Sequence, residues 1–174
     1  ITLGDNTPLD AVCKMFETLN RRGVKLTVFE LLMARSFANK VSLRQLWDKT
    51  VEENQILEQF EIDPYYVLQI VNLMNGGSIK RKDILEMEPA VVSENWNRAT
   101  NALTESIEFL RKQCGILSSN LLPYNTMLVP MAAVWAKTSD IKGPQETVRR
   151  DKITQWFWSS VFAQVYEKGP TSRA

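Results

Sequence analysis

The chain has 174 residues, of which 44% are hydrophobic, and a formal net charge of +1. This length lies within the range of single domains and is enough to bury one or two modest cores. The near-neutral charge provides no global attraction for nucleic acid, so any such contact must be local. The sequence contains no histidine, which excludes Ser–His and Cys–His nucleophile systems and removes the commonest metal ligand.

The cysteine content and the hydropathy indicate the compartment. Cys13 and Cys114 are too few for a zinc site or a disulfide framework, and each falls on the apolar stripe of a predicted helix. We expect both to be buried and reduced in a cytoplasmic protein. No signal peptide is recognisable, and the longest apolar run, residues 128–136, is about half as long as a membrane span. The sequence therefore predicts no metal and no membrane partner.

The first two predicted helices have the most complete local signals in the chain. The first begins at Pro8 and carries one apolar stripe that ends near Asn20. The second begins at Thr27, where Glu30 completes a capping box, in which each side chain accepts from the other residue's free backbone N–H. These signals fix the connecting loop from both sides.

That loop presents Asn20, Arg21, Arg22 and Gly23 beside a helix N-terminus, where free N–H groups favour an anion. We therefore take these four residues as candidates for contact with a nucleotide or another anion. The alternative is a solvated basic turn. In that case Asn20 caps the preceding helix and Gly23 supplies a positive φ angle.

Two more helix starts follow in the first half of the chain. Ser42 and Gln45 form another capping box, and Asp63 and Pro64 form an N-cap with proline at the first helical position. The helix that begins at Pro64 should end at the glycine pair of residues 76–77.

A basic triplet, Lys80, Arg81 and Lys82, follows the glycine pair. It lacks the P-loop spacing, in which a glycine directly precedes the lysine and a serine or threonine follows it. We interpret the triplet as a solvated connector that leads into a short helix or turn at residues 83–88. Contact with a nucleic-acid backbone is the weaker alternative.

The longest predicted helix runs from Pro89 to Cys114 and ends at Gly115. Its apolar residues recur at alternating steps of four and three, which is typical of the spine of a helical bundle. A further helix begins near Asn125, and Pro130 should kink it or confine it to a late start.

The last predicted helix, at about residues 146–168, is apolar on nearly every side in its second half. Such a helix is normally buried, or it is covered by a partner. We therefore take Trp156, Trp158 and Phe162 as candidates for a partner interface.

No segment shows the alternation and turn dipeptides of a β-hairpin. The caps and stripes predict an all-α fold, an irregular helical bundle of about seven helices. We expect two helical regions, residues 1–76 and 77–174.

Three blocks of the sequence resemble one prokaryotic family. The first contains Phe16, Glu17, Asn20, Gly23, Leu26 and Thr27 and is similar to the pattern F-E-x-x-N-x-x-G-x-x-L-[ST]. Residues 122–130 are similar to L-P-Y…L-P, and residues 156–166 to W-F-W…Y. This family is the domain of unknown function that forms the N-terminal, GmrS-like part of GmrSD-type modification-dependent restriction endonucleases.

In that family a ParB/sulfiredoxin-like α/β subdomain comes first and carries a D-G-Q-Q-R motif for nucleotide binding and hydrolysis. The motif is missing here. The resemblance therefore implies a fragment of a larger α/β plus helical protein of antiviral defence. The fragment itself is expected to be non-catalytic and to hold no cofactor, whereas the full-length protein takes a nucleoside triphosphate.

The partners that the resemblance implies are the missing N-terminal ParB-like subdomain, modified DNA, and a nuclease domain or subunit. The alternative function is a helical protein–protein interaction or scaffold domain with no nucleotide or DNA role.

Overall fold

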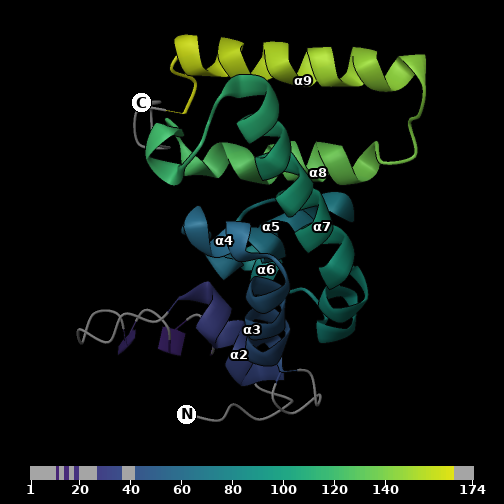
Figure 1. Ribbon diagram of the computed structural model, residues 1–174. Coiled ribbons are helices and arrows are strands. Elements are labelled where there is room, and N and C mark those ends of the chain that lie inside the picture. Colours follow the sequence, from purple (N-terminus) through teal and green to yellow (C-terminus); the bar gives the residue numbers. More distant parts are fainter. Residues whose placement is uncertain (1–10, 12–13, 16–17, 20–26, 37–41, 167–174) are drawn as a thin grey trace.

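The computed structural model describes residues 11, 14–15, 18–19, 27–36 and 42–166. In these ranges the chain forms eight α-helices and two short 3-10 helices and contains no strand, which confirms the all-α class (Figure 1). The elements are α2 (Val28–Ser36), α3 (Leu43–Glu53), α4 (Gln55–Gln59), α5 (Pro64–Met74), α6 (Arg81–Leu85), α7 (Pro89–Cys114), η2 (Ser119–Leu121), η3 (Asn125–Met127), α8 (Leu128–Lys137) and α9 (Pro144–Phe162).

The predicted helix starts are confirmed by their hydrogen bonds. The Thr27 backbone N–H donates to Glu30 Oε2 at 2.7 Å, and the Glu30 N–H donates to Thr27 Oγ1 at 3.1 Å. Ser42 Oγ caps α3 by accepting from the N–H three residues later at 3.3 Å. Asp63 caps α5 in front of Pro64 and accepts from the N–H two residues later at 2.9 Å. Each of these bonds joins near neighbours in the sequence, so the residue pattern alone indicated them.

The predicted spine of the fold is α7. It ends at Gly115, whose φ of 69° places it in the left-handed region that glycine adopts without strain. Within the core, Trp96 Nε1 donates to Thr50 Oγ1 at 2.9 Å, so α7 is also held to α3 by a buried hydrogen bond. The predicted apolar stripe is fully buried at Val92, Trp96, Ala99, Leu103, Ile107 and Leu110.

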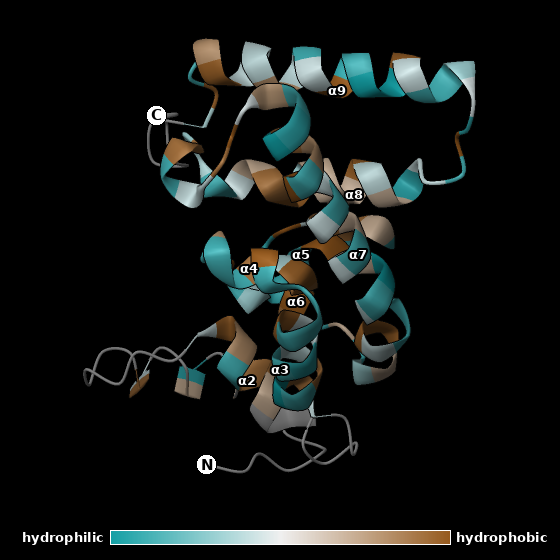
Figure 2. Cartoon of the chain, viewed as in Figure 1, coloured by the Kyte–Doolittle hydropathy of each residue, from teal (hydrophilic) through white to brown (hydrophobic). Residues whose placement is uncertain are grey.

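Three helices, α5, α7 and α8, form the centre of the fold, and the other helices lie around them. α7 packs closely against α5 and α8, and α5 also packs against α8. Figure 1 shows α9 lying alongside α8 at one end of the molecule, while α2 and α3 lie at the other end. Hydrophobic residues are concentrated in α5 and α8, whereas α9 is hydrophilic through its middle (Figure 2). The division expected at residue 76 falls at the turn after α5 and stays a prediction.

Two predicted boundaries were wrong. α9 ends at Phe162, well before residue 168, because Gln164 adopts a left-handed conformation with φ of 51°. The N–H groups of Gln164 and Val165 each bond back to a carbonyl of the last turn at 3.2 Å, which closes the helix with a Schellman-type cap. α6 begins at Arg81, earlier than the predicted 83–88 segment, and the five-residue α4 was not predicted.

The remaining predictions concern proline, cysteine and the membrane. Pro130 is the third residue of α8 and so lies in its first turn, which agrees with the predicted late start of the helix. Cys114 is a free, half-buried thiol, less buried than predicted, and Cys13 lies outside the described residues. Among the helices of the described ranges, none combines the length and the apolar content needed to cross a bilayer.

Candidate functional site

The predicted anion-contact residues Asn20, Arg21, Arg22 and Gly23 lie outside the described residues. Their role stays a prediction. The structure does describe the helix start that follows them. There the capping box of Thr27 and Glu30 fixes the first turn of α2.

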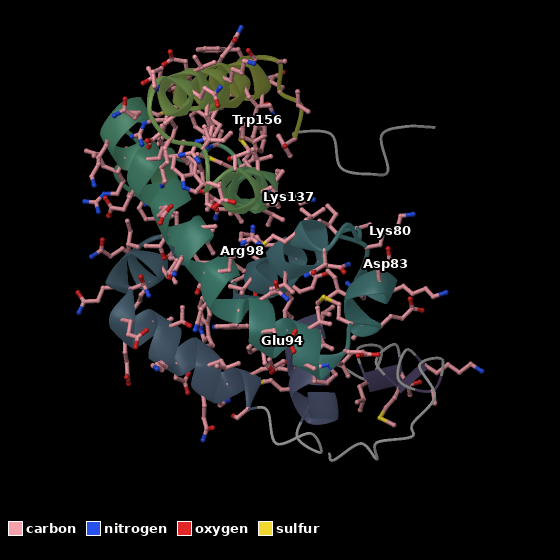
Figure 3. The ribbon with its side chains drawn as sticks, turned by 90° about the vertical axis from the view of Figure 1, so that its right-hand side faces the viewer. Lys80, Asp83, Glu94, Arg98, Lys137 and Trp156 are labelled. Atoms are coloured by element: carbon pink, nitrogen blue, oxygen red, sulfur yellow. The ribbon has the colours of Figure 1, made fainter. Side chains whose placement is uncertain are left out.

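The basic triplet, residues 80–82, is exposed at the start of α6. Acidic residues accompany it: Lys82 Nζ lies 3.8 Å from Glu86 Oε1, and Asp83 accepts a hydrogen bond from the serine hydroxyl that also accepts from the Lys80 N–H. An exposed ion pair of this kind contributes little stability. Figure 3 shows Lys80 and Asp83 together at α6, well away from Trp156. Contact of the triplet with nucleic acid stays a prediction.

The three aromatic residues predicted as a partner interface do not form one surface. Trp156 is half-buried and lies between α9 and α8 (Figure 3). Trp158 is two residues further on, about 200° around the helix. It packs edge-on against Phe157 at 5.1 Å and stacks on Phe162 at 5.8 Å between ring centroids. Phe162 is 79% exposed, so this second surface opens to solvent on another side of α9.

A groove of about 490 Å³ runs between α8 and α9. Val134 of α8 and Val148 of α9 line it and are 49% and 52% exposed, although valine is usually buried. The charged residues that line it are Arg149 and Lys152, and no carboxylate of the described residues contributes to its lining. The groove is therefore apolar with a positive edge.

Arg149 lines the groove and connects the two helices beside it. Its Nη1 donates at 2.5 Å to the carbonyl of Thr138, the C-cap residue of α8, and its guanidinium stacks over the Trp135 ring at 4.7 Å. A cation at a helix C-terminus also opposes the negative end of the dipole. The side chain is only 10% exposed, and its Nε is buried with no hydrogen-bond partner in the described residues. Arg149 thus links α9 to the C-terminal end of α8.

A second, polar pocket of about 320 Å³ lies among α7, α8 and α9. Trp135 Nε1 donates to Glu105 Oε2 at 2.7 Å, and the Arg150 guanidinium lies 5.0 Å from the centroid of the Phe109 ring. Cations and carboxylates line this pocket together, so their charges largely cancel. We interpret it as a network that stabilises the contact of α7 with α9. Its charged residues are Glu105, Glu108, Glu146, Lys112, Lys142, Arg149 and Arg150.

No group of three or more histidine, cysteine, aspartate or glutamate side chains in the described ranges is placed to hold a metal ion. Burial raises the pKa of Cys114 and of Tyr166, which favours their neutral forms at neutral pH.

The amino-acid sequence does not indicate most of the groove. Val148 and Lys152 precede Trp156 at steps of four, so they share one face of α9, but a mixture of valine, lysine and tryptophan has no recognisable hydrophobic period. Val134 lies in a helix that is apolar on almost every side, so the sequence does not indicate which side stays open. The four-residue spacing was the available signal.

The comparisons with known proteins give one informative similarity. An uncharacterized protein of Methanocaldococcus jannaschii is 30% identical over 183 aligned residues, which cover 98% of this chain and 30% of that protein. The chain thus spans about 30% of the length of the curated relative that it matches. No model of a protein family matches the chain, and no solved structure matches it.

Proposed function

We propose that this chain is the non-catalytic helical portion of a GmrSD-like restriction protein that acts in antiviral defence. In this role it packs against a nucleotide-handling ParB-like subdomain and contacts modified DNA or a nuclease partner. The three sequence blocks that resemble the family support the proposal. The similarity to a region covering 30% of a longer archaeal protein is compatible with such a modular arrangement.

The observation that carries the interaction role is the groove between α8 and α9. Val134 and Val148 leave apolar surface exposed on facing helices, and exposed apolar patches typically mark sites where another surface packs. Phe162 exposes apolar surface on another side of α9. The helix would therefore be partly covered from two sides in a larger assembly.

The nucleotide-related part of the proposal rests on the loop of residues 20–23. A loop that is fixed before binding loses less conformational entropy when it holds an anion. Asn20 and Gly23 match positions of the family pattern, and the capping box at Thr27 fixes the following helix start. We propose that this loop faces the nucleotide-handling subdomain or its anionic ligand.

The test compares the full-length protein that contains this chain with the purified 174-residue chain. We expect the full-length protein to hydrolyse a nucleoside triphosphate and to restrict modified DNA, and the 174-residue chain to hydrolyse none. In the full-length protein, Asn20→Ala and Arg22→Ala should reduce hydrolysis at an unchanged melting temperature. Lys49→Ala, at an exposed cation of α3, is the matched control. Turnover by the 174-residue chain, or activity losses that only follow lost stability, would contradict the assignment.

A second candidate is a helical protein–protein interaction domain with no nucleotide or DNA role. The groove favours this role as strongly as the first, since apolar packing requires neither ligand. The two candidates differ in the sequence that precedes Ile1 in the genome. A D-G-Q-Q-R motif there supports the restriction protein, and its absence leaves the interaction domain.

A further inference from the structure

The shape of the groove is that of a site for a helix. Its two walls are single faces of α8 and α9, each continuing over two turns, so the lined length along each helix is about 12 Å. Val134 and Val148 are each about half exposed, so the groove is open along its side. The lining residues that follow one another at steps of four are Pro130, Val134 and the C-cap Thr138 on α8, and Val148, Lys152 and Trp156 on α9.

The charge of the groove defines what it can hold. Arg149 and Lys152 are its charged lining residues, and neither α8 nor α9 places a carboxylate in the lining. Arg149 is already engaged with Thr138 and Glu146. Lys152 is exposed and forms no ion pair with any described residue. An occupant should therefore be apolar where it meets the valines and acidic where it meets Lys152.

We propose that the groove binds an amphipathic α-helix of a partner protein, whose apolar face is flanked by glutamate or aspartate. Such a helix would lie against α8 and α9 as the third member of a three-helix layer, and its apolar side chains would cover the exposed valines. A second copy of this chain fits less well, because the groove would then bring the same cations together. This inference deepens the interaction role proposed above.

The first experiment uses synthetic peptides of about 15 residues, long enough for four helical turns. The acidic probe carries leucines on one face, flanked by glutamates, and a fluorescein label. The matched probe carries lysine at each glutamate position. In fluorescence anisotropy titrations with the 174-residue chain, we expect the acidic probe to bind at micromolar concentration and the basic probe at least about tenfold more weakly.

Three variants locate the binding site. Val148→Glu places a carboxylate in the groove and should weaken binding of the acidic probe by about tenfold or more. Lys152→Glu should reverse the order of the two probes. Phe162→Glu is the matched control, because it adds the same charge to the exposed apolar surface on another side of α9 and should change the affinity by less than about twofold. Urea unfolding of each variant verifies that it is folded.

Several results would overturn the inference. Neither probe binding up to about 1 mM, equal affinity for both probes, or an equal effect of Phe162→Glu and Val148→Glu would each exclude an acidic helix in the groove. Binding of dodecanoate that Val148→Glu abolishes, with no peptide binding, would identify a small-molecule site instead. Concentration-dependent dimerisation that the same variant abolishes would identify a second copy. The assay contains no nucleotide or DNA, so its failure leaves the restriction assignment to its own test.

Discussion

α8 packs against α5 and α7 on one side and against α9 on the other, and the two contacts are built from different side chains. On the first side the helices approach closely, and several of the residues buried in α7 and α8 are small. This side is closed and contains the fully buried residues of the core. The alanines buried in α7 and α8 include Ala99, Ala102, Ala132 and Ala136.

On the second side, large side chains occupy the space between the helices. Arg149 reaches from α9 to the C-cap of α8 and stacks on Trp135, and Trp156 lies further along the same face. The separation of two packed helices depends on the side chains at their contact. Both sides of α8 are apolar, so composition does not distinguish them. The two sides differ in packing: the first is closed by the core, whereas the second leaves Val134 and Val148 about half exposed.

The largest expected effect comes from the closed side. Leu103→Ala removes a fully buried side chain of α7 and should lower the free energy of unfolding by about 3 kcal/mol, since a close-packed core relaxes only partly around a cavity. Val148→Ala on the open side should change it by less than about 0.5 kcal/mol. Urea unfolding measures both. Similar losses for the two variants would mean that the groove is not open in solution.

A smaller effect is expected from Arg149, which links α9 to α8. Arg149→Met keeps the apolar stem but removes the charged hydrogen bond to the Thr138 carbonyl, and it should cost about 2 kcal/mol. Arg150→Met is the control, because the Arg150 side chain is more exposed and interacts with Phe109 and Glu146 without a hydrogen bond to a helix end, and it should cost about 0.5 kcal/mol. If the two variants are equally stable, Arg149 does not determine the spacing of the helices.

The capping box at Thr27 belongs to α2 and lies outside both contacts of α8, so its loss gives a stability change to compare with the two effects above. Thr27→Ala removes the acceptor of the Glu30 N–H and should lower the free energy of unfolding by about 1 kcal/mol. Thr27→Ser keeps a hydroxyl and should have little effect. Equal urea midpoints for all three proteins would show that the cap contributes nothing to stability.

The smallest effect is a pH dependence at the open side. Burial raises the pKa of Tyr166 above its ordinary value of 10.0, so as the pH rises the unfolded chain loses this proton before the folded chain does. The stabilisation is complete below about pH 10 and is lost as the pH rises through the folded pKa. The free energy of unfolding should thus fall more steeply above about pH 10 in the wild type than in Tyr166→Phe.

Urea unfolding between about pH 9 and pH 11 measures this difference. Burial also raises the pKa of Tyr65 and Tyr66. The stability of Tyr166→Phe should therefore still fall with rising pH, and the difference between its slope and that of the wild type reports on Tyr166 alone. Identical slopes in both proteins would mean that Tyr166 is as exposed in the folded chain as in the unfolded chain.

The sequence by itself determined the all-α class, the starts of α2, α3 and α5, and the position and buried face of α7. These features depend on caps, glycine and apolar periodicity, which act between residues at most a few positions apart. The end of α9 escaped this reasoning because the left-handed residue is Gln164, and glutamine is not a typical residue for a helix end. The candidate loop at residues 20–23 remains a sequence prediction.

Only the tertiary structure decided which apolar residues form the core and which form a surface. Trp156 and Trp158 are equivalent in the sequence, yet one lines the groove and the other stacks on Phe162. Arg149 joins the two walls of the groove by contacts with Thr138 and Trp135, which lie too far away in the sequence for a local pattern to encode them. The distance between two helices depends on contacts between residues far apart in the chain, so it becomes defined only when the helices pack.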